Sequence, residues 1–530
     1  MPIKSLLVAS CAIAALVPAA SAAQARRAAG APVVQTASGK VEGKVVNGVS
    51  AFLGIPYGAD TGGANRFLPP RPVAPWKGIK PAQAMGPRCP QPAVKVPLAI
   101  IKFSDAPISE DCLALNLWTP ATSGKRAVMV WIHGGGFAFG SANDVYYDGT
   151  GLARNEDVVV VSLNHRLNGF GYLDLGPDAG PAFAGAANVG QLDIIAALRW
   201  VKANIARFGG DPDNVTIFGQ SGGGGKVSTL IAMPAAKGLF HKAIIESGSN
   251  IKTDTPQMAA AQRDKVLAAF GLEPAEIGKL RTMALPDLVA GFQKAGLLGF
   301  RPWVDGTILP TQPADPVMSP LAHDVPVLLG TAHDEATDVA IANPMWLKLT
   351  EAQMRAAIAP MVGPARVDRA IALYRARVPG DTPPQVFASV LTDAMFGHKA
   401  IVMATRKAEA GGAPVYAYRI EWKTPVLDGV LRAPHGVELP FVFDTVAVAP
   451  ELVGTVPQPG MVRLFQQTFA AFARTGNPAV PGNPAWPPYS AAHRATFIYD
   501  TTPHVVVDPD ADLRRFWDEA SGDNSEPPKQ

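Results

Sequence analysis

"NVTIFGQSGGGGKVSTLIAM" (residues 214–233) is the stretch that decides the fold. Its first five residues are typical of a buried strand, and "KVSTLIAM" can begin a helix. The "GQSGG" between them is a G-x-S-x-G motif, which in a strand–turn–helix context presents the serine, here Ser221, as a nucleophile. Because such a sharp turn packs closely against both elements, we expect Gly219 and Gly223 to have no room for a side chain.

Nucleotide-binding loops and flexible tethers match these glycines less well. A phosphate-binding loop needs Ser or Thr after its Gly-Lys pair, but Val227 follows Lys226. A dinucleotide-binding fingerprint needs an acidic residue about 20 positions further on, and the first one here, Glu246, ends a predicted strand. A flexible tether does not fit between two apolar segments. The motif is therefore interpreted as a nucleophile elbow.

Short apolar runs alternate with helical stretches along much of the chain. Because β-branched and apolar residues fill these runs almost continuously, we expect strands that are buried on both faces. This repetition predicts an α/β fold with a mostly parallel central sheet flanked by helices. Two helical inserts, 257–289 and 350–377, are predicted to cap the edge of the sheet. The predicted strands are 127–132, 157–163, 214–218, 243–247, 325–330 and 415–420.

Composition supports one compact unit. Of the 530 residues, 48% are hydrophobic and 17% are charged, which excludes a disordered chain. The net charge of +3, without any block of Lys or Arg, argues against a nucleic-acid partner. No break in composition marks a domain boundary, so we expect a single catalytic domain over 23–520 and a disordered tail over 521–530.

The first 22 residues are typical of a cleavable signal peptide. Lys4 gives a positive start, an apolar run follows, and Ala20-Ser21-Ala22 is a small-residue cleavage pattern. The apolar run is short for a membrane anchor, which is the competing interpretation. We therefore expect a secreted or periplasmic protein without stable membrane insertion.

Removal of this segment leaves two cysteines, Cys89 and Cys112. In an exported protein an even pair favours a disulfide, and closing a loop of this size stabilises by roughly 3 kcal/mol in the chain-entropy model. Two buried free thiols are the alternative.

A second glycine-rich motif, "WIHGGGFAFG" (residues 131–140), follows an earlier predicted strand. It matches the HGGG-type loop whose backbone N–H groups stabilise a developing oxyanion. We expect these N–H groups to come from Gly135 and Gly136, together with Gly222 after the serine. The alternative is an ordinary glycine loop in which His133 only makes structural hydrogen bonds.

Taken in order, the motifs resemble a type-B carboxylesterase of the carboxylesterase/cholinesterase family. The resemblance runs from "FLGIPYG" (52–58) to "TGNPAVPGNPAWPPY" (475–489), almost the whole mature chain. "SEDCLALNLWTP" (109–120) and "NHRLNGFGYL" (164–173) lie between them. The resemblance implies the α/β-hydrolase fold with helical cap insertions and a small-molecule ester as substrate.

A histidine must take the proton of the serine hydroxyl. The order serine, acid, histidine of α/β-hydrolases favours one late in the chain: His398, His435, His493 or His504. His435, in "RAPHGVELPFVF", is predicted on a loop and matches the family's catalytic-histidine motif. His398 lies in a predicted helix, and the other two lie in polar surface stretches.

The acid is predicted at the end of the strand in "VPVLLGTAHDEATDV", where Asp334 and Glu335 enter the following loop. Resemblance to the family points to Glu335, where a D-E-G pattern is usual. Here Ala336 replaces that glycine. The carboxylate is unaffected, but the backbone conformation next to it is not predicted by the family pattern. Asp334 remains the alternative acid.

Together these residues predict a serine esterase that forms an acyl-enzyme, with Ser221 as nucleophile, His435 as general base and Glu335 orienting the histidine. The chemistry needs neither cofactor nor metal, and the histidines lack metal-ligand spacing. An amidase, lactonase or carbamate hydrolase could use the same triad, and a non-catalytic binding protein of the same fold is the other alternative. The sequence does not indicate an oligomeric state. The substrates are predicted to be small to medium, hydrophobic or aryl esters. Candidates for an apolar gorge, each of them equally a candidate for the ordinary core, are Phe137, Phe139, Phe300, Trp303, Phe396 and Phe441.

Overall fold

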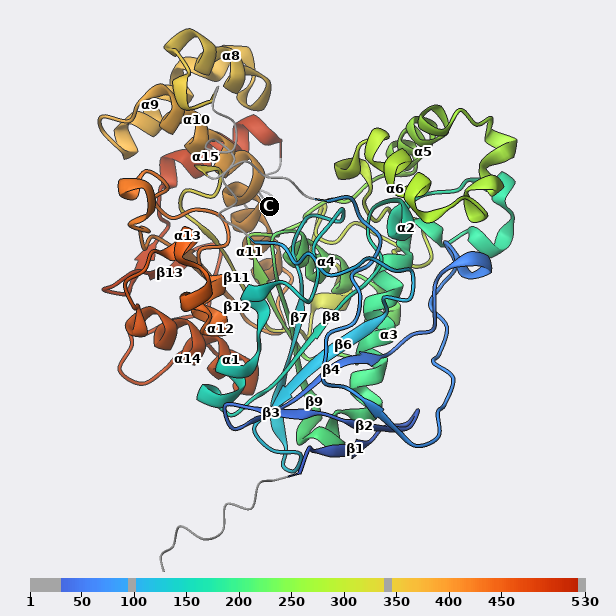
Figure 1. Cartoon of the computed structure of the whole chain (residues 1–530). Coiled ribbons are helices and arrows are strands. Elements are labelled where there is room, and N and C mark those ends of the chain that lie inside the picture. Colours follow the sequence, from blue (N-terminus) through green and yellow to red (C-terminus); the bar gives the residue numbers. More distant parts are fainter. Residues whose placement is uncertain (1–29, 94–101, 338–345, 523–530) are drawn as a thin grey trace, which may run out of the picture.

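A computed structural model describes residues 30–93, 102–337 and 346–522. Its centre is an 11-stranded sheet (Figure 1). The strands of this sheet are β3 (Lys44–Val46), β4 (Val49–Pro56), β6 (Ala114–Thr119), β7 (Arg126–Ile132), β8 (Val159–Leu163), β9 (Gly210–Gln220), β10 (Lys242–Glu246), β11 (Val327–Ala332), β12 (Val415–Ile420), β13 (Ala495–Tyr499) and β14 (His504–Val507). A small separate sheet contains β1 (Val33–Gln35), β2 (Lys40–Glu42) and β5 (Ile79–Pro81).

The large sheet has the order β14-β13-β12-β11-β10-β9-β7-β8-β6-β4-β3. From β13 to β8 every neighbouring pair is parallel, whereas β14 and the strands from β6 to β3 add antiparallel edges. The mostly parallel sheet predicted from the sequence is confirmed. All six predicted strands are present, and β12 has the predicted bounds.

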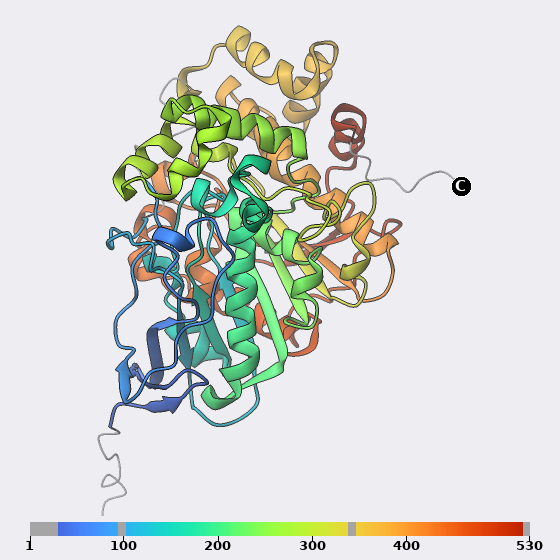
Figure 2. The same cartoon turned by 90° about the vertical axis from the view of Figure 1, so that its right-hand side faces the viewer.

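Helices cover both faces of the sheet and extend beyond one of its ends (Figures 1 and 2). Among the described residues the α-helices are α1 (Thr150–Glu156), α2 (Asn168–Tyr172), α3 (Val189–Asn204), α4 (Gly222–Leu230), α5 (Pro256–Phe270), α6 (Leu285–Lys294), α8 (Glu351–Val362), α9 (Val367–Arg377), α10 (Pro383–Thr392), α11 (His398–Glu409), α12 (Leu439–Phe443), α13 (Pro450–Val453), α14 (Pro459–Thr475) and α15 (Ala511–Ser521).

Two hydrophobic cores lie on opposite faces of the sheet. In β7, Val128, Val130 and Ile132 pack into the core that contains α3, α4 and α11. Met129 and Trp131, the residues between them, pack into the core that contains α12 and α14. Because successive side chains of a strand point to opposite faces, burial on both faces requires an almost unbroken apolar run. This explains the apolar strands of the sequence.

Both predicted helical inserts extend beyond the end of the sheet where α4 begins (Figures 1 and 2). The first, predicted over 257–289, covers most of α5 and the start of α6, between β10 and β11. The second, predicted over 350–377, covers α8 and α9, and α10 follows it before β12. This end carries the carboxyl ends of the parallel strands, where α/β enzymes place their ligands. The predicted cap is therefore present.

One helical stretch, Pro383–Glu409, is long and apolar enough by composition to cross a membrane. It comprises α10, a π-helical turn and α11, and 56% of its most apolar window is buried inside the protein. That burial is typical of a core helix. The predicted signal peptide (1–22) lies outside the described residues, as does the predicted tail from residue 523 on; α15 ends at Ser521.

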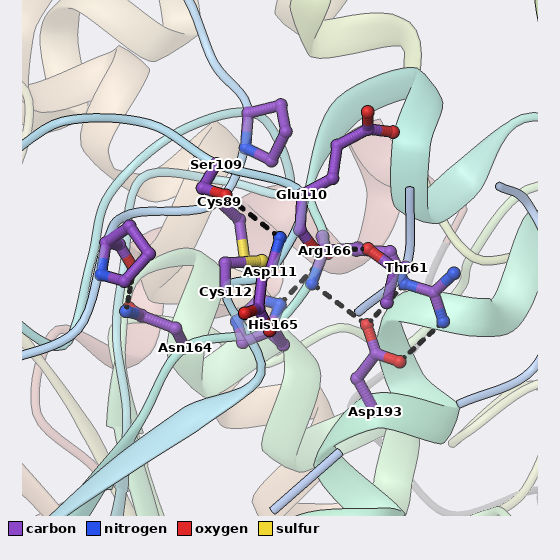
Figure 3. The surroundings of a disulfide bond; sticks show 12 residues. Thr61, Cys89, Ser109, Glu110, Asp111, Cys112, Asn164, His165, Arg166 and Asp193 are labelled. Atoms are coloured by element: carbon purple, nitrogen blue, oxygen red, sulfur yellow. Dashed lines mark hydrogen bonds and ion pairs between the residues drawn. A yellow bond between two sulfur atoms is a disulfide. The ribbon is translucent and has the colours of Figure 1, made fainter. Parts of the chain in front are cut away.

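The predicted disulfide between Cys89 and Cys112 is present, with Cα atoms 5.1 Å apart (Figure 3). It joins the loop after β5 to the residues just before β6. The alternative of two free thiols is wrong. Nearby, the buried Arg166 and Asp193 form an ion pair with an N–O distance of 2.6 Å. This pair fixes the loop after β8 to α3, one of the helices that cover the sheet.

Candidate active site

Ser221 occupies a sharp turn between β9 and α4. Its backbone has φ 57° and ψ −125°, a conformation that side-chain-bearing residues rarely adopt and that is found at functional sites. Its N–H donates to the carbonyl of Glu246 at 2.8 Å, which ties the turn to the end of β10. A Cβ atom on Gly223 would lie 2.0 Å from the carbonyl oxygen of Ile132, and one on Gly219 would lie 2.6 Å from the same oxygen. The expected need for glycine at both positions is confirmed.

The HGGG loop lies directly against this turn. Gly135 and Gly136 have φ of 86° and 64°, in the left-handed region that favours glycine. A Cβ on Gly222 would lie 2.0 Å from the carbonyl oxygen of Gly136. The structure therefore brings the three glycines predicted as oxyanion donors together, although they come from two segments.

Glu335 and His435 are in direct contact. Glu335 lies just after β11 and is fully buried, and His435 lies on the loop before α12. The Oε2 atom of Glu335 forms a hydrogen bond with Nδ1 of His435. Its Oε1 atom accepts from the backbone N–H of Ala332 at 2.8 Å and from the hydroxyl of Ser247. These bonds fix both oxygens of the carboxylate, so the imidazole is held from its Nδ1 side.

Asp334, the alternative acid, contacts other groups. Its Oδ2 atom lies 2.9 Å from Nδ1 of His333, and its Oδ1 atom lies 3.6 Å from the guanidinium of Arg432. Burial alone would raise the pKa of Asp334, but His333 and Arg432 outweigh it and lower that pKa below its usual value. The carboxylate of Asp334 is thus bound to His333 and Arg432, whereas the carboxylate of Glu335 contacts His435.

The substitution of Ala336 for the family's glycine is accommodated. The residue is fully buried, its backbone is not left-handed, and its N–H donates to the Thr392 hydroxyl at 3.0 Å. The question raised by the sequence is thereby answered: the backbone at this position does not require glycine.

The elbow approaches the histidine through Gln220. The amide nitrogen of this side chain lies 3.2 Å from Nε2 and 3.4 Å from Nδ1 of His435. Gln220 directly precedes Ser221, so the contact brings the turn and the imidazole to one place. Phe396 packs on the same ring, with centroids 5.0 Å apart.

The other late histidines lie elsewhere. His398 begins α11, as the predicted helix implied, and its Nε2 atom lies 2.9 Å from a carboxylate oxygen of Asp518. His493 and His504 are exposed, as predicted. Within the described ranges no group of three or more His, Cys, Asp or Glu side chains is arranged to hold a metal ion.

Two further carboxyl groups, those of Glu246 and Glu438, are buried beside this arrangement. Neither has a hydrogen-bond partner for its side-chain oxygens among the described residues. Burial raises the pKa of both carboxyls, that of Glu438 to about 8, and their proximity to each other or to Glu335 adds to the effect. At neutral pH a protonated Glu438 adds no negative charge beside His435.

Four of the six aromatic candidates for a gorge show clearly different surroundings. Phe396 contacts the histidine. Phe137 belongs to the HGGG loop but is only 6% exposed and packs in the same hydrophobic cluster as Phe300. Phe300 and Phe441 are core residues, only 1% and 0% exposed. For these two the alternative of a core position holds: Phe300 packs on Phe292 of α6, and Phe441 of α12 packs on Trp422 in the loop after β12.

Sequence reasoning missed two contacts of the site, Ser247 and Gln220. Ser247 directly follows β10, so its place at a strand end is the signal that was available in the sequence. Its partner Glu335 is 88 positions away, and a pairing over that separation cannot be read from local pattern.

Comparison with known proteins agrees with this geometry. A family model described as "Carboxylesterase family" matches residues 30–517. The para-nitrobenzyl esterase of Bacillus subtilis (strain 168) is 36% identical over 91% of this chain and 98% of its own. The phenmedipham hydrolase of Pseudarthrobacter oxydans is 33% identical over 88% of this chain and 94% of its own.

Solved structures show the same relationship. A carboxylesterase of Geobacillus stearothermophilus superposes with a TM-score of 0.82 at 38% identity, over 92% of this chain and 99% of its own. An esterase from Clostridium hathewayi, described as able to hydrolyse aliphatic aromatic polyesters, has a TM-score of 0.76 at 33% identity, over 93% of this chain and 99% of its own. By sequence and by fold, this chain belongs to the carboxylesterase family.

Proposed function

We propose that this enzyme hydrolyses small to medium carboxylic esters, aryl esters above all, through an acyl-enzyme on Ser221. The observation that carries the proposal is the contact between Glu335 and His435, placed beside a strained serine turn and three glycines of the oxyanion type. An arrangement of nucleophile, base and orienting acid is recognised by such geometry.

The proposed reaction has two stages. His435 takes the proton of the Ser221 hydroxyl as its oxygen attacks the ester carbonyl, and Glu335 stabilises the imidazolium that forms. The N–H groups of Gly135, Gly136 and Gly222 donate to the resulting oxyanion. His435 then gives the proton to the departing alcohol. Water repeats the sequence on the acyl-enzyme and releases the acid.

The side chains around the site support apolar substrates. Phe396 packs on His435, which faces the leaving alcohol, so an aryl alcohol would meet an aromatic ring there. At the HGGG loop, the side chain of Leu298, which is 67% exposed, would lie 3.7 Å from a Cβ atom on Gly136. Two relatives are named for para-nitrobenzyl esters and for phenmedipham, which agrees with an aromatic group in the substrate.

The first experiment compares p-nitrophenyl acetate, butyrate and octanoate as substrates of the wild type and of Ser221→Ala. We expect turnover by the wild type and a loss of about 10⁶-fold in kcat for the variant, as for triad serines elsewhere. His435→Ala should lose a similar factor, whereas His493→Ala, an exposed histidine outside the site, should keep wild-type kcat.

The same assay separates the alternatives. Turnover of matched anilides, lactones or carbamates faster than of esters would replace the ester proposal with another hydrolase of the same triad. A wild type that turns over none of these compounds would favour the non-catalytic binding protein.

We also propose that the protein is exported and loses residues 1–22. The disulfide between Cys89 and Cys112 supports this, since such bonds persist in oxidising compartments. Mass spectrometry of enzyme purified from its native host should find Ala23 as the first residue. An intact N-terminus would overturn the proposal.

A further inference from the structure

Lys226 is a fully buried lysine that the reaction described above does not use. It lies on α4, in the turn that follows the nucleophile elbow, with 0% of its surface exposed. Lysine is almost never fully buried unless its amine is paired. Here the Nζ atom donates to the backbone carbonyl of His133 at 3.0 Å. The acceptor belongs to the HGGG loop, so this one side chain joins the two segments of the site.

The contacts of Lys226 lie on both sides of the proposed donor glycines. Its amine donates to the carbonyl of His133, which precedes Gly135 by two residues. The same amine lies 5.5 Å from the ring centroid of Phe137, the residue directly after Gly136. Side chains of a helix tilt towards its N-terminus. Lys226 is one turn after Gly222, so this tilt directs its stem back towards the loop.

The oxyanion site depends on the relative position of these two segments. Two of its N–H groups belong to the HGGG loop and the third to the start of α4, and close contact between Gly222 and Gly136 limits only how near the segments come. A hydrogen bond limits how far they separate. The His133 ring also stacks on His165, with centroids 4.6 Å apart. The start of the loop is thus held by a bond and by a stacked ring.

Charge does not oppose this role. Burial lowers the pKa of Lys226 well below its usual value, and a neutral amine still donates N–H. Burial likewise lowers the pKa values of His133 and His165, so the three neighbouring bases do not repel one another as cations.

We propose that Lys226 is a positioning residue, which holds the HGGG loop against α4 so that the N–H groups of Gly135, Gly136 and Gly222 converge on one oxyanion. The inference rests on the proposed function of those three glycines.

The test compares Lys226→Met with Lys226→Gln. The two side chains are similar in size, but methionine lacks the donor and glutamine keeps an N–H that can reach a carbonyl. Each variant is assayed with an aryl ester and with its thionoester, in which sulfur, a weaker hydrogen-bond acceptor, replaces the carbonyl oxygen. The concentration of active enzyme is determined by titration of the serine with an organophosphate, and kcat is calculated from that concentration. Unfolded protein therefore does not affect kcat.

For Lys226→Met we expect kcat on the oxygen ester to fall by about 10- to 100-fold, somewhat less than the loss of a direct oxyanion donor, with KM nearly unchanged. The ratio of ester to thionoester turnover should fall by about tenfold, because the thionoester depends less on the donors. Lys226→Gln should recover most of both quantities. If the lysine were merely structural, its replacement would lower thermal stability without changing the ratio of ester to thionoester turnover.

A folded Lys226→Met with the wild-type ratio overturns the inference. Lys226→Leu, also without a donor, replaces the methionine variant if that one does not accumulate. If neither variant folds, the lysine is needed for folding and the positioning role is wrong. Failure of the proposed function is distinct, since the wild type would then turn over no ester or Ser221→Ala would retain ester turnover.

Discussion

The two halves of the site are built by different means. The proposed oxyanion half consists of backbone segments held close together, where a single added carbon on Gly222 or Gly223 would lie 2.0 Å from a carbonyl oxygen. The acid–base half consists of side chains from separate loops, joined by the hydrogen bonds of Glu335 to His435, Ser247 and Ala332. Steric contact cannot be weakened gradually, whereas a network loses one bond at a time. Mutations in the first half should therefore abolish activity, whereas mutations in the second half should reduce activity by different amounts.

The largest effect is expected for Gly223→Ala. The new methyl group meets the carbonyl of Ile132, which belongs to a central strand and cannot withdraw, so the elbow must deform. We expect loss of about 3 kcal/mol or more in unfolding free energy and no measurable esterase activity, by urea titration and p-nitrophenyl acetate assay.

Gly225→Ala is the matched control two residues along α4. The nearest atom to its added carbon is the amide nitrogen of the Asn250 side chain, at 2.8 Å, which can rotate away. A Gly225 variant as damaged as the Gly223 variant would show that the helix start, and not the backbone contact, is sensitive.

Glu335→Gln should reduce kcat by about 10⁴-fold while the protein remains folded, since an amide favours the wrong tautomer of the histidine. The kcat for p-nitrophenyl butyrate and the melting temperature measure the two effects. Asp334→Asn provides the comparison, because Asp334 faces His333 and Arg432. A larger kcat loss for Asp334→Asn would exchange the roles of the two acids.

Ser247→Ala should have a smaller effect, about tenfold in kcat, because Glu335 keeps its bonds to Ala332 and His435. Ser249→Ala is the control: this serine is also buried, but its hydroxyl has no hydrogen-bond partner among the described residues. Equal kcat values for the two variants would remove Ser247 from the network.

The last prediction concerns the pH dependence of stability and not activity. Since burial raises the pKa of Glu438 to about 8, the folded protein retains a proton that the unfolded chain loses near pH 4.5. Between these values the folded state binds more protons, so stability falls as pH rises, by up to about 1.4 kcal/mol per pH unit. In Glu438→Gln the decrease of unfolding free energy with pH should be smaller by the amount that corresponds to about one proton. The contribution of the Glu246 carboxyl should remain. Parallel urea-unfolding profiles of variant and wild type at pH 5.5, 6.5 and 7.5 would contradict the assignment.

The central strands were predictable because both of their faces are buried, which leaves a continuous apolar signal in the sequence. The edge strands β3 and β14 have partly exposed residues and lack that signal. They are held by pairing with β4 and β13, which only the folded chain brings beside them.

The serine and the glycines were predictable because one turn and one loop contain them. The acid was not decided by position, since Asp334 and Glu335 leave the same strand end, and the choice came from the family pattern. Phe396 and Phe441 illustrate a further limit. Phe396 lies near the predicted helix of His398 and Phe441 follows the predicted loop of His435, yet the first packs on His435 and the second on Trp422, a difference that arises only from tertiary packing.

The two helical inserts differ in their independence. The hydrophobic cluster of α8, α9 and α10 is completed by α15 and includes no residue of the central strands. The cluster of α5 and α6 includes Phe137, which belongs to the HGGG loop. The α8–α10 insert still touches the site, because the hydroxyl of Thr392, the last residue of α10, accepts from the N–H of Ala336 beside Glu335. An exchange of this insert between relatives should therefore preserve the chemistry only if that contact is kept. Changes in α5 and α6, in contrast, also affect the packing of the HGGG loop. Variants of these helices should therefore be screened for substrate preference and for turnover at the same time.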